Sequence, residues 1–180
     1  MKATGIVRRI DELGRIVIPK EIRRTFKIRE GTPMEIFSND NGELVLKKYS
    51  PVMEIGEISN DVCESIYQAL ENNVLICDKD NVVSCSGSST FKKQFLHKNI
   101  TLALEKIIEE RKPVLLNSSE NASLINIIKE EVNYKSLIIL PLVASGDTYG
   151  AIILVGENAF SNVEVKLLQG FANFIAFQIA

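Results

Sequence analysis

Arginine side chains are concentrated near the N-terminus of this chain. The stretch "RRIDELGRIVIPKEIRR", residues 8–24, holds five arginines and one lysine. A guanidinium is a planar, permanently charged donor that binds a phosphate or a guanine edge through two parallel hydrogen bonds, which an ammonium cannot do. A solvated face is the commoner origin of a basic cluster, but the preference for arginine favours a surface that binds a phosphate backbone.

The spacing of the arginines places them on neighbouring elements. β-branched runs flank the turn "DELG", so Arg8 and Arg15 are expected on adjacent strands. Pro19 is typical of the first turn of a helix, and Arg23 and Arg24 follow it on that helix, about 100° apart around its axis. A two-fold dimer would double this surface and match the pseudo-symmetry of duplex DNA. We therefore predict that the surface binds double-stranded DNA.

The charge of the chain is divided unevenly. The net charge is −2, but residues 1–53 hold eleven basic against seven acidic residues (+4), whereas residues 54–180 hold ten against sixteen (−6). Such asymmetry is typical of a chain in which one part meets a polyanion. It therefore places the DNA-binding function in the first part.

The remaining composition argues against several other classes of protein. Cys63, Cys77 and Cys85 are widely spaced and His97 is the only histidine, so we expect neither a zinc site nor a disulfide framework. The longest apolar run, residues 137–144, is too short to span a bilayer and fits a buried strand. The N-terminus lacks the apolar stretch of a secretory signal, so we expect a cytoplasmic protein. No cofactor is expected.

Residues 1–53 are expected to form a small β-rich domain. The expected order is strand, strand, helix, strand, strand, at residues 4–10, 14–19, 20–28, 34–38 and 43–48. Asn41-Gly42 favours a tight turn between the last two strands, because both residues accept a positive φ. A domain of this size buries only about 60% of its unfolded surface. Because it is nevertheless rich in apolar side chains, we predict an obligate dimer in this region.

Residues 54–180 are expected to form a larger α+β domain. The expected elements are a helix at 55–71, two strands in 72–89, a helix at 100–112, a strand at 113–117, two strands in 135–157 and a helix at 161–180. Ser161 and Glu164 have the spacing of a capping box at the start of the last helix. That helix is apolar around most of its girth, so we expect it to pack on its own sheet, on the 55–71 helix and on a second chain.

Residues 1–51 closely resemble the DNA-binding domain of the AbrB-like transition-state regulators, and the run "TGIVRRIDELGRIVIPKEIRRT" carries that resemblance. It implies a swapped-hairpin dimer, in which hairpins of two chains interleave into one barrel-like core. It also implies that the residues that contact DNA are Arg8, Arg15, Arg23 and Arg24, and that Arg9 stands at a position that is basic in the family. A preference for DNA shape over a strict consensus is implied too, which agrees with the lack of a long recognition helix.

The whole chain resembles a family of sporulation regulators in which an AbrB-like domain, here residues 1–53, precedes a GAF domain, here residues 54–180. The match of the second part rests on the order of its elements and on "VLICD" and "YGAIIL". The expected fold class is therefore α+β, with an N-terminal swapped-hairpin, β-barrel-like dimer followed by an α+β GAF domain with flanking helices. The resemblance implies a homotetramer, and both activation and repression of forespore genes.

GAF domains often hold a small ligand over the sheet. The candidate lining is Cys85, Ser86 and Ser88, because small hydroxyls beside Gly87 suit a phosphate or a polar metabolite. A polar turn after a strand explains the same residues without any ligand, and we favour that interpretation.

Two further function classes remain open as alternatives. Some GAF proteins reduce methionine sulfoxide with paired cysteines, but Cys77 and Cys85 lie in apolar runs with only Lys79 close by to lower a thiol pKa. We therefore expect no enzyme. Antitoxins share the swapped-hairpin fold and wrap a toxin with a disordered acidic tail. Residues 54–180 are too apolar and too regularly patterned to be such a tail, so a protein-binding antitoxin is the less favoured hypothesis.

Overall fold

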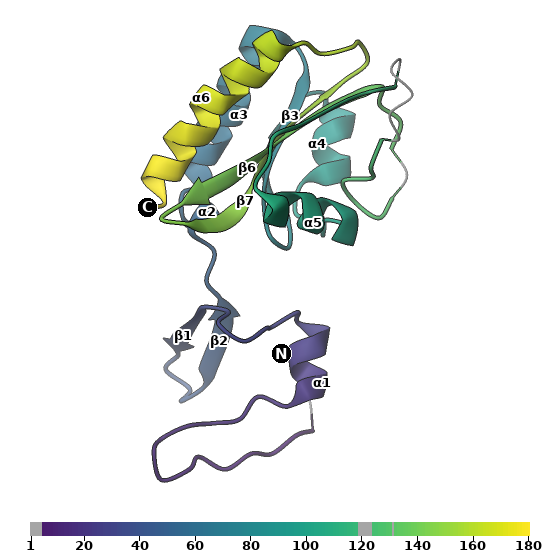
Figure 1. The fold of residues 1–180 in the computed structure, drawn as a ribbon. Coiled ribbons are helices and arrows are strands. Elements are labelled where there is room, and N and C mark those ends of the chain that lie inside the picture. Colours follow the sequence, from purple (N-terminus) through teal and green to yellow (C-terminus); the bar gives the residue numbers. More distant parts are fainter. Residues whose placement is uncertain (1–4, 119–123, 131) are drawn as a thin grey trace. The chain divides into compact units, whose positions relative to one another are not determined.

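The computed structural model describes residues 5–118, 124–130 and 132–180 (Figure 1). The chain divides into two compact units, one up to Tyr49 and one from Ser50 onward. Among the described residues, the helices are all too short or too polar to cross a lipid bilayer.

A β-hairpin and a short helix form the regular structure of the first unit. Strands β1 (Met34–Ser38) and β2 (Leu44–Lys48) pair antiparallel, as predicted. Asn39 closes their turn, because its Oδ1 accepts the backbone N–H of Glu43 at 2.9 Å. Gly42 has a φ of 76°, which a side chain would disfavour. Helix α1 (Lys20–Thr25) follows Pro19, also as predicted.

The two strands expected at residues 4–10 and 14–19 are wrong for the single chain. The described residues 5–19 contain no strand. They instead form two arms, residues 5–10 and 15–19, on either side of a tight turn at residues 11–14. The backbone N–H of Asp11 donates to the carbonyl of Arg15, and that of Gly14 to the carbonyl of Asp11, both at 3.0 Å. A strand requires a neighbouring strand with which it forms a ladder of hydrogen bonds, and the described part of the single chain pairs no strand with these arms. Within the described residues the single chain accordingly has no closed barrel.

The second unit is built on one antiparallel sheet with the strand order β4-β3-β7-β6-β5. Its strands are β3 (Asn73–Asp78), β4 (Val82–Ser86), β5 (Val114–Asn117), β6 (Ser136–Ala144) and β7 (Asp147–Gly156). All five coincide with predicted strands. In the centre, Ile152 pairs with Ile76 on one side and Leu140 on the other. Gly150 allows the close pairing of β7 with β3, because a Cβ there would lie 1.9 Å from the Cys77 carbonyl oxygen.

Helices cover both faces of this sheet (Figure 1). On one face lie α2 (Pro51–Glu54), α3 (Gly56–Leu70) and α6 (Asn162–Gln178), whose apolar side chains share a core with the sheet. On the other face lie α4 (Ser89–Phe95) and α5 (Leu102–Glu110) with a second core. These two layers confirm the predicted α+β class. They also bury nearly every side chain of the three central strands.

The start of the second unit is anchored to the sheet. The Ser50 hydroxyl accepts the N–H of Met53 at 3.3 Å, which caps α2, and donates to Asp78 Oδ2 at 2.9 Å. The other oxygen of Asp78 accepts the N–H groups of Asp80 and Asn81, each at 2.7 Å. One nearly buried carboxylate therefore joins the first helix of the unit to the β3–β4 turn.

We expect Ser50→Ala to lower the free energy of unfolding of the second unit by ~1–2 kcal/mol, because it removes a helix cap and leaves Asp78 Oδ2 without that donor. Urea unfolding followed by circular dichroism measures the change. Ser65→Ala is the control, because this exposed hydroxyl on α3 bonds only a carbonyl of its own helix. Equal unfolding midpoints for the two variants would show that the Ser50–Asp78 bond contributes nothing to stability.

Candidate nucleic-acid interface

The five arginines singled out in the sequence all belong to the first unit. Arg8, Arg9 and Arg15 lie on the arms of the turn, and Arg23 and Arg24 lie in the last turn of α1. All five side chains are exposed to solvent. The structure thus places five guanidinium groups on the surface of one small unit, and each of them is accessible to a phosphate or a base edge.

The turn between the arms is organised by one carboxylate. Asp11 Oδ1 accepts the backbone N–H of Leu13 at 3.0 Å and that of Arg15 at 2.8 Å, while Oδ2 pairs with Arg15 Nε at 2.9 Å. These hydrogen bonds lower the pKa of Asp11 below its ordinary value. The bond from the Arg15 backbone N–H has the largest effect on the pKa, and the bond from the Arg15 side chain has the next largest. The carboxylate is therefore ionised at neutral pH.

Helix α1 carries the other two arginines, Arg23 and Arg24. Neighbouring positions on a helix lie about 100° apart, so Arg23 and Arg24 diverge from the axis in a fan. Both lie at the C-terminal end of α1, where the helix dipole favours positive charge. Pro19 is the N-cap residue and accepts the N–H of Arg23 at 3.0 Å, which fixes the start of the helix relative to the second arm.

Apolar side chains of the first unit are largely uncovered in the single chain. Pro19 is its one buried residue among those described. The exposed large apolar side chains are Ile6, Val7, Ile10, Leu13, Ile16, Val17, Phe26, Ile36, Phe37, Leu44, Leu46 and Tyr49. Apolar exposure on this scale marks an interaction surface. The unit therefore lacks a core of its own until something covers these residues.

The candidate ligand residues do not converge on one face of the sheet. Cys85 is half-buried against the core of the α4–α5 face, and its Sγ lies 4.0 Å from the Lys92 carbonyl oxygen. Ser86 is buried and donates to Glu64 of α3, on the opposite face. Ser88 caps α4 by accepting the N–H of Phe91 at 3.1 Å. Helix α4 was not predicted from the sequence; Ser88, a residue type typical of an N-cap, is the signal that could have identified its start.

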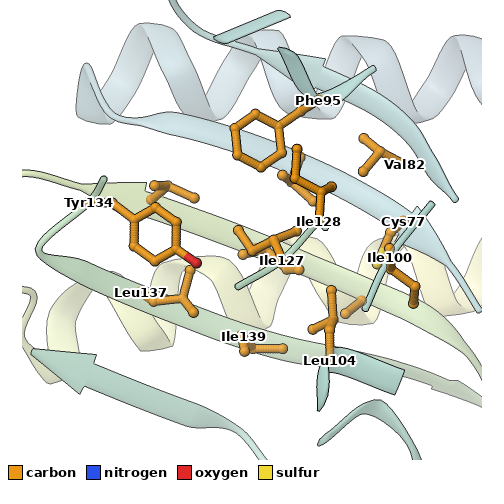
Figure 2. Packing of buried hydrophobic residues seen from close by; sticks show 14 of the residues in the cluster. Cys77, Val82, Phe95, Ile100, Leu104, Ile127, Ile128, Tyr134, Leu137 and Ile139 are labelled. Atoms are coloured by element: carbon orange, nitrogen blue, oxygen red, sulfur yellow. The ribbon is translucent and has the colours of Figure 1, made fainter. Parts of the chain in front are cut away.

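Side chains of the chain itself occupy the α4–α5 face of the sheet. Figure 2 shows Ile127, Ile128 and Tyr134 packed with residues of the sheet and of both helices. Both isoleucines are fully buried. Their segment is held by the N–H of Thr101, which donates to the Ile127 carbonyl at 2.9 Å, and by a bridge between Ile100 and Ile128. A ligand that lay against this part of the face would have to displace these isoleucines.

The three thiols are poorly suited to nucleophilic chemistry. Burial raises the pKa of Cys63, raises that of Cys77 to about 12, and raises that of half-buried Cys85 as well. A thiol with a raised pKa stays protonated at neutral pH, whereas the thiolate is the reactive form. Among the described residues there is no cluster of three or more metal-binding side chains either.

One further apolar surface lies on the second unit. Val163, Phe174 and Phe177 of α6 are 72%, 47% and 80% exposed, while Leu168, Ala172 and Ile175 of the same helix are buried in the core. The capping box of this helix is present as predicted, because Glu164 accepts from Ser161 N at 2.8 Å and Ser161 Oγ accepts from Val163 N at 3.1 Å. The well-formed helix thus carries a second apolar side that its own sheet leaves uncovered.

Both units of the chain are similar in sequence to parts of known transcription regulators. Residues 54–180 match the family described as stage V sporulation protein T C-terminal, transcription factor, and residues 7–53 match that described as antidote-toxin recognition MazE, bacterial antitoxin. Stage V sporulation protein T of Bacillus subtilis (strain 168) is 46% identical over 180 residues, with 99% of each chain covered. The transition state regulatory protein AbrB of the same organism is 53% identical over 64 residues, which is 34% of this chain and 66% of AbrB.

Solved structures share the fold of the second unit. The GAF domain from an Acinetobacter phosphoenolpyruvate-protein phosphotransferase superposes with a TM-score of 0.58 at 14% identity, covering 74% of this chain and 84% of that one. A type II free methionine-R-sulfoxide reductase from Thermoplasma acidophilum gives a TM-score of 0.56 at 16% identity, covering 71% and 94%. At these identities the likeness shows the GAF fold alone.

Proposed function

The chain belongs to the stage V sporulation protein T family of transcription factors, and from that membership we propose that Arg8, Arg9, Arg15, Arg23 and Arg24 form its DNA-binding surface. The protein is a DNA-binding transcription regulator of sporulation. The observation that carries the proposed site is the exposure of all five guanidinium groups on one small unit that is related to AbrB. Residues 1–53 are then the DNA-binding domain and residues 54–180 the domain for assembly and sensing.

Arginine can supply both parts of DNA recognition. Contacts to phosphates provide affinity and fix the register, while contacts to base edges and to groove shape provide sequence preference. Arg15, on a tight turn, is held in a defined place and suits a base edge or a narrow groove. Arg23 and Arg24, spread around a helix end, suit two points along a phosphate backbone.

We also propose that the protein acts as a homotetramer at the nucleoid of the forespore. The uncovered apolar side chains of the first unit support a dimer in which two chains supply the strands that one chain lacks. The exposed apolar side of α6, which includes Phe174 and Phe177, supports a second contact between GAF domains. Activation at some forespore promoters and repression at others would follow from where the bound tetramer lies relative to polymerase.

No catalytic function is proposed for the GAF domain. The protonated thiols oppose methionine sulfoxide reduction, which the name of the Thermoplasma relative attributes to that protein. The antitoxin match of residues 7–53 fits a shared DNA-binding fold, since residues 54–180 form a packed domain in place of a toxin-wrapping tail. A small molecule that binds the sheet where Ile127 and Ile128 pack would require these two side chains to move.

Salt dependence of binding tests the proposed site. If four of the five guanidinium groups of each chain contact phosphates, a dimer touches about eight phosphates, so log K against log salt concentration should have a slope of roughly −7 for one dimer. Fluorescence anisotropy with a labelled promoter duplex at several salt concentrations measures this slope. A slope close to zero would exclude an arginine–phosphate interface. Sedimentation velocity of the same sample tests the tetramer independently of DNA binding.

A further inference from the structure

We propose that Asp11 is a positioning residue for DNA recognition, which holds the Arg15 guanidinium by one edge so that its other edge is presented to DNA. This inference rests on the proposed function of Arg15 as a DNA contact. It assigns a role to an acidic side chain that lies within a basic surface, where its charge alone would weaken the binding of a polyanion.

The turn is a single hydrogen-bonded unit. Asp11 Oδ1 accepts two backbone N–H groups, those of Leu13 and Arg15, and two backbone bonds join Asp11 to Arg15 and Gly14. Gly14 has a φ of 74°, the left-handed conformation that such a turn needs. The carboxylate is therefore fixed relative to the backbone of both arms, and whatever its second oxygen holds is fixed as well.

That second oxygen holds Arg15 by its Nε, at 2.9 Å. A guanidinium has five N–H donors, one on Nε and four on the two terminal nitrogens. With Nε bonded to Asp11, the terminal nitrogens form the fork that binds a guanine edge or a phosphate in bidentate fashion. The Arg15 side chain is 69% exposed, so this fork is accessible to a ligand.

Charge and positioning make opposite predictions for the loss of Asp11. A negative charge near DNA repels every duplex alike, so its removal by itself should strengthen binding to all sequences. Positioning instead favours the duplex whose bases match the orientation of the fork. Loss of positioning should therefore reduce the ratio of specific to non-specific affinity, even while overall charge becomes more favourable.

Asp11→Asn separates the two effects. The Asn Oδ1 can still accept the N–H groups of Leu13 and Arg15, but its NH2 group faces the Nε–H of Arg15 as a second donor and cannot bond it. We expect the ratio of affinity for a promoter duplex to that for a scrambled duplex to fall about fivefold or more. Glu12→Gln is the matched control, because it removes the same charge from the next, exposed position and should leave that ratio unchanged.

The experiment also distinguishes this inference from the proposed function. If Asp11 acts through Arg15, then Asp11→Asn should have no further effect on the ratio in an Arg15→Ala background. If Arg15→Ala leaves DNA affinity unchanged, the proposed site itself fails. If Arg15→Ala weakens binding but Asp11→Asn only strengthens binding to both duplexes, as Glu12→Gln does, Asp11 has no positioning role.

A spectroscopic measurement covers the case in which the variant folds poorly. In the wild-type protein without DNA, the bond to Asp11 should slow the hydrogen exchange of the Arg15 Nε–H relative to that of Arg23. Exchange of the Arg15 Nε–H as fast as that of Arg23 in the folded wild-type protein would overturn the proposal without any mutation.

Discussion

Replacing Arg23 by alanine is expected to weaken binding to promoter DNA by about 100-fold or more and to abolish a gel shift at moderate salt. A hydrogen bond to a charged partner contributes ~1.5–3 kcal/mol, and a two-fold dimer loses two of them. The salt dependence should become shallower at the same time, by about 0.9 for each phosphate that the protein no longer neutralises. Arg15→Ala is expected to have an effect of the same order. Fluorescence anisotropy with the wild-type promoter duplex measures both quantities.

The fold should survive this substitution. Arg23 is exposed, and substitutions at such positions usually change the free energy of unfolding by less than ~0.5 kcal/mol. Lys93→Ala is a suitable control, because Lys93 is an exposed cation of the GAF domain and its loss changes net charge equally. Arg23→Lys should retain part of the affinity, since it keeps the charge but loses the bidentate geometry. If Arg23→Ala bound DNA as tightly as the wild-type protein and had an unchanged circular dichroism spectrum, the C-terminal end of α1 would not be part of the DNA interface.

Features that depend on local sequence were predicted well. The pairing of β1 with β2 depends on the Asn39–Gly42 turn, and the start of α6 depends on a capping box formed by Ser161 and Glu164. In both cases the bonds join residues within four positions of each other, so the sequence itself contains both partners. Strands β6 and β7 were likewise recognisable, because continuous apolar runs on either side of a turn leave few other structures open to them.

Features that depend on partners far away in the sequence, or on another chain, were not predicted. Residues 5–19 have strand-like composition but lack a neighbouring strand in the single chain, so no ladder forms. Cys85 and Ser86 are adjacent in sequence and were grouped as one site, yet the alternation of a strand directs them to opposite faces.

Asp11 is a different case, because its partner is close in sequence and it was nevertheless treated only as a turn residue. Its pairing with Arg15, four positions later, is the kind of local signal that could have identified it.

Substituting Val17 by aspartate is expected to disrupt the association of two N-terminal units and, with it, DNA binding. Val17 is 69% exposed in the single chain, so in an isolated monomer an aspartate there would cost little. In a dimer whose shared core covers this side chain, an unpaired carboxylate would be buried at a cost of several kcal/mol. The dissociation constant of the N-terminal dimer should therefore rise at least about 100-fold, which corresponds to ~2.7 kcal/mol.

The variant also tests how the chains are connected, because the two proposed contacts lie on different units. If GAF domains associate separately, Val17→Asp should change the sedimentation velocity profile from tetramer to dimer, and DNA affinity should fall together with the loss of tetramer. Asn41→Asp adds the same charge to the same unit at an exposed turn, and it should preserve both the tetramer and most of the affinity. Assembly and DNA binding equal to those of Asn41→Asp would show that Val17 stays solvated in the assembled protein. The arms that carry Arg8 and Arg15 would then not pair with a second chain. The single chain would have to hold its DNA-binding surface in place by itself.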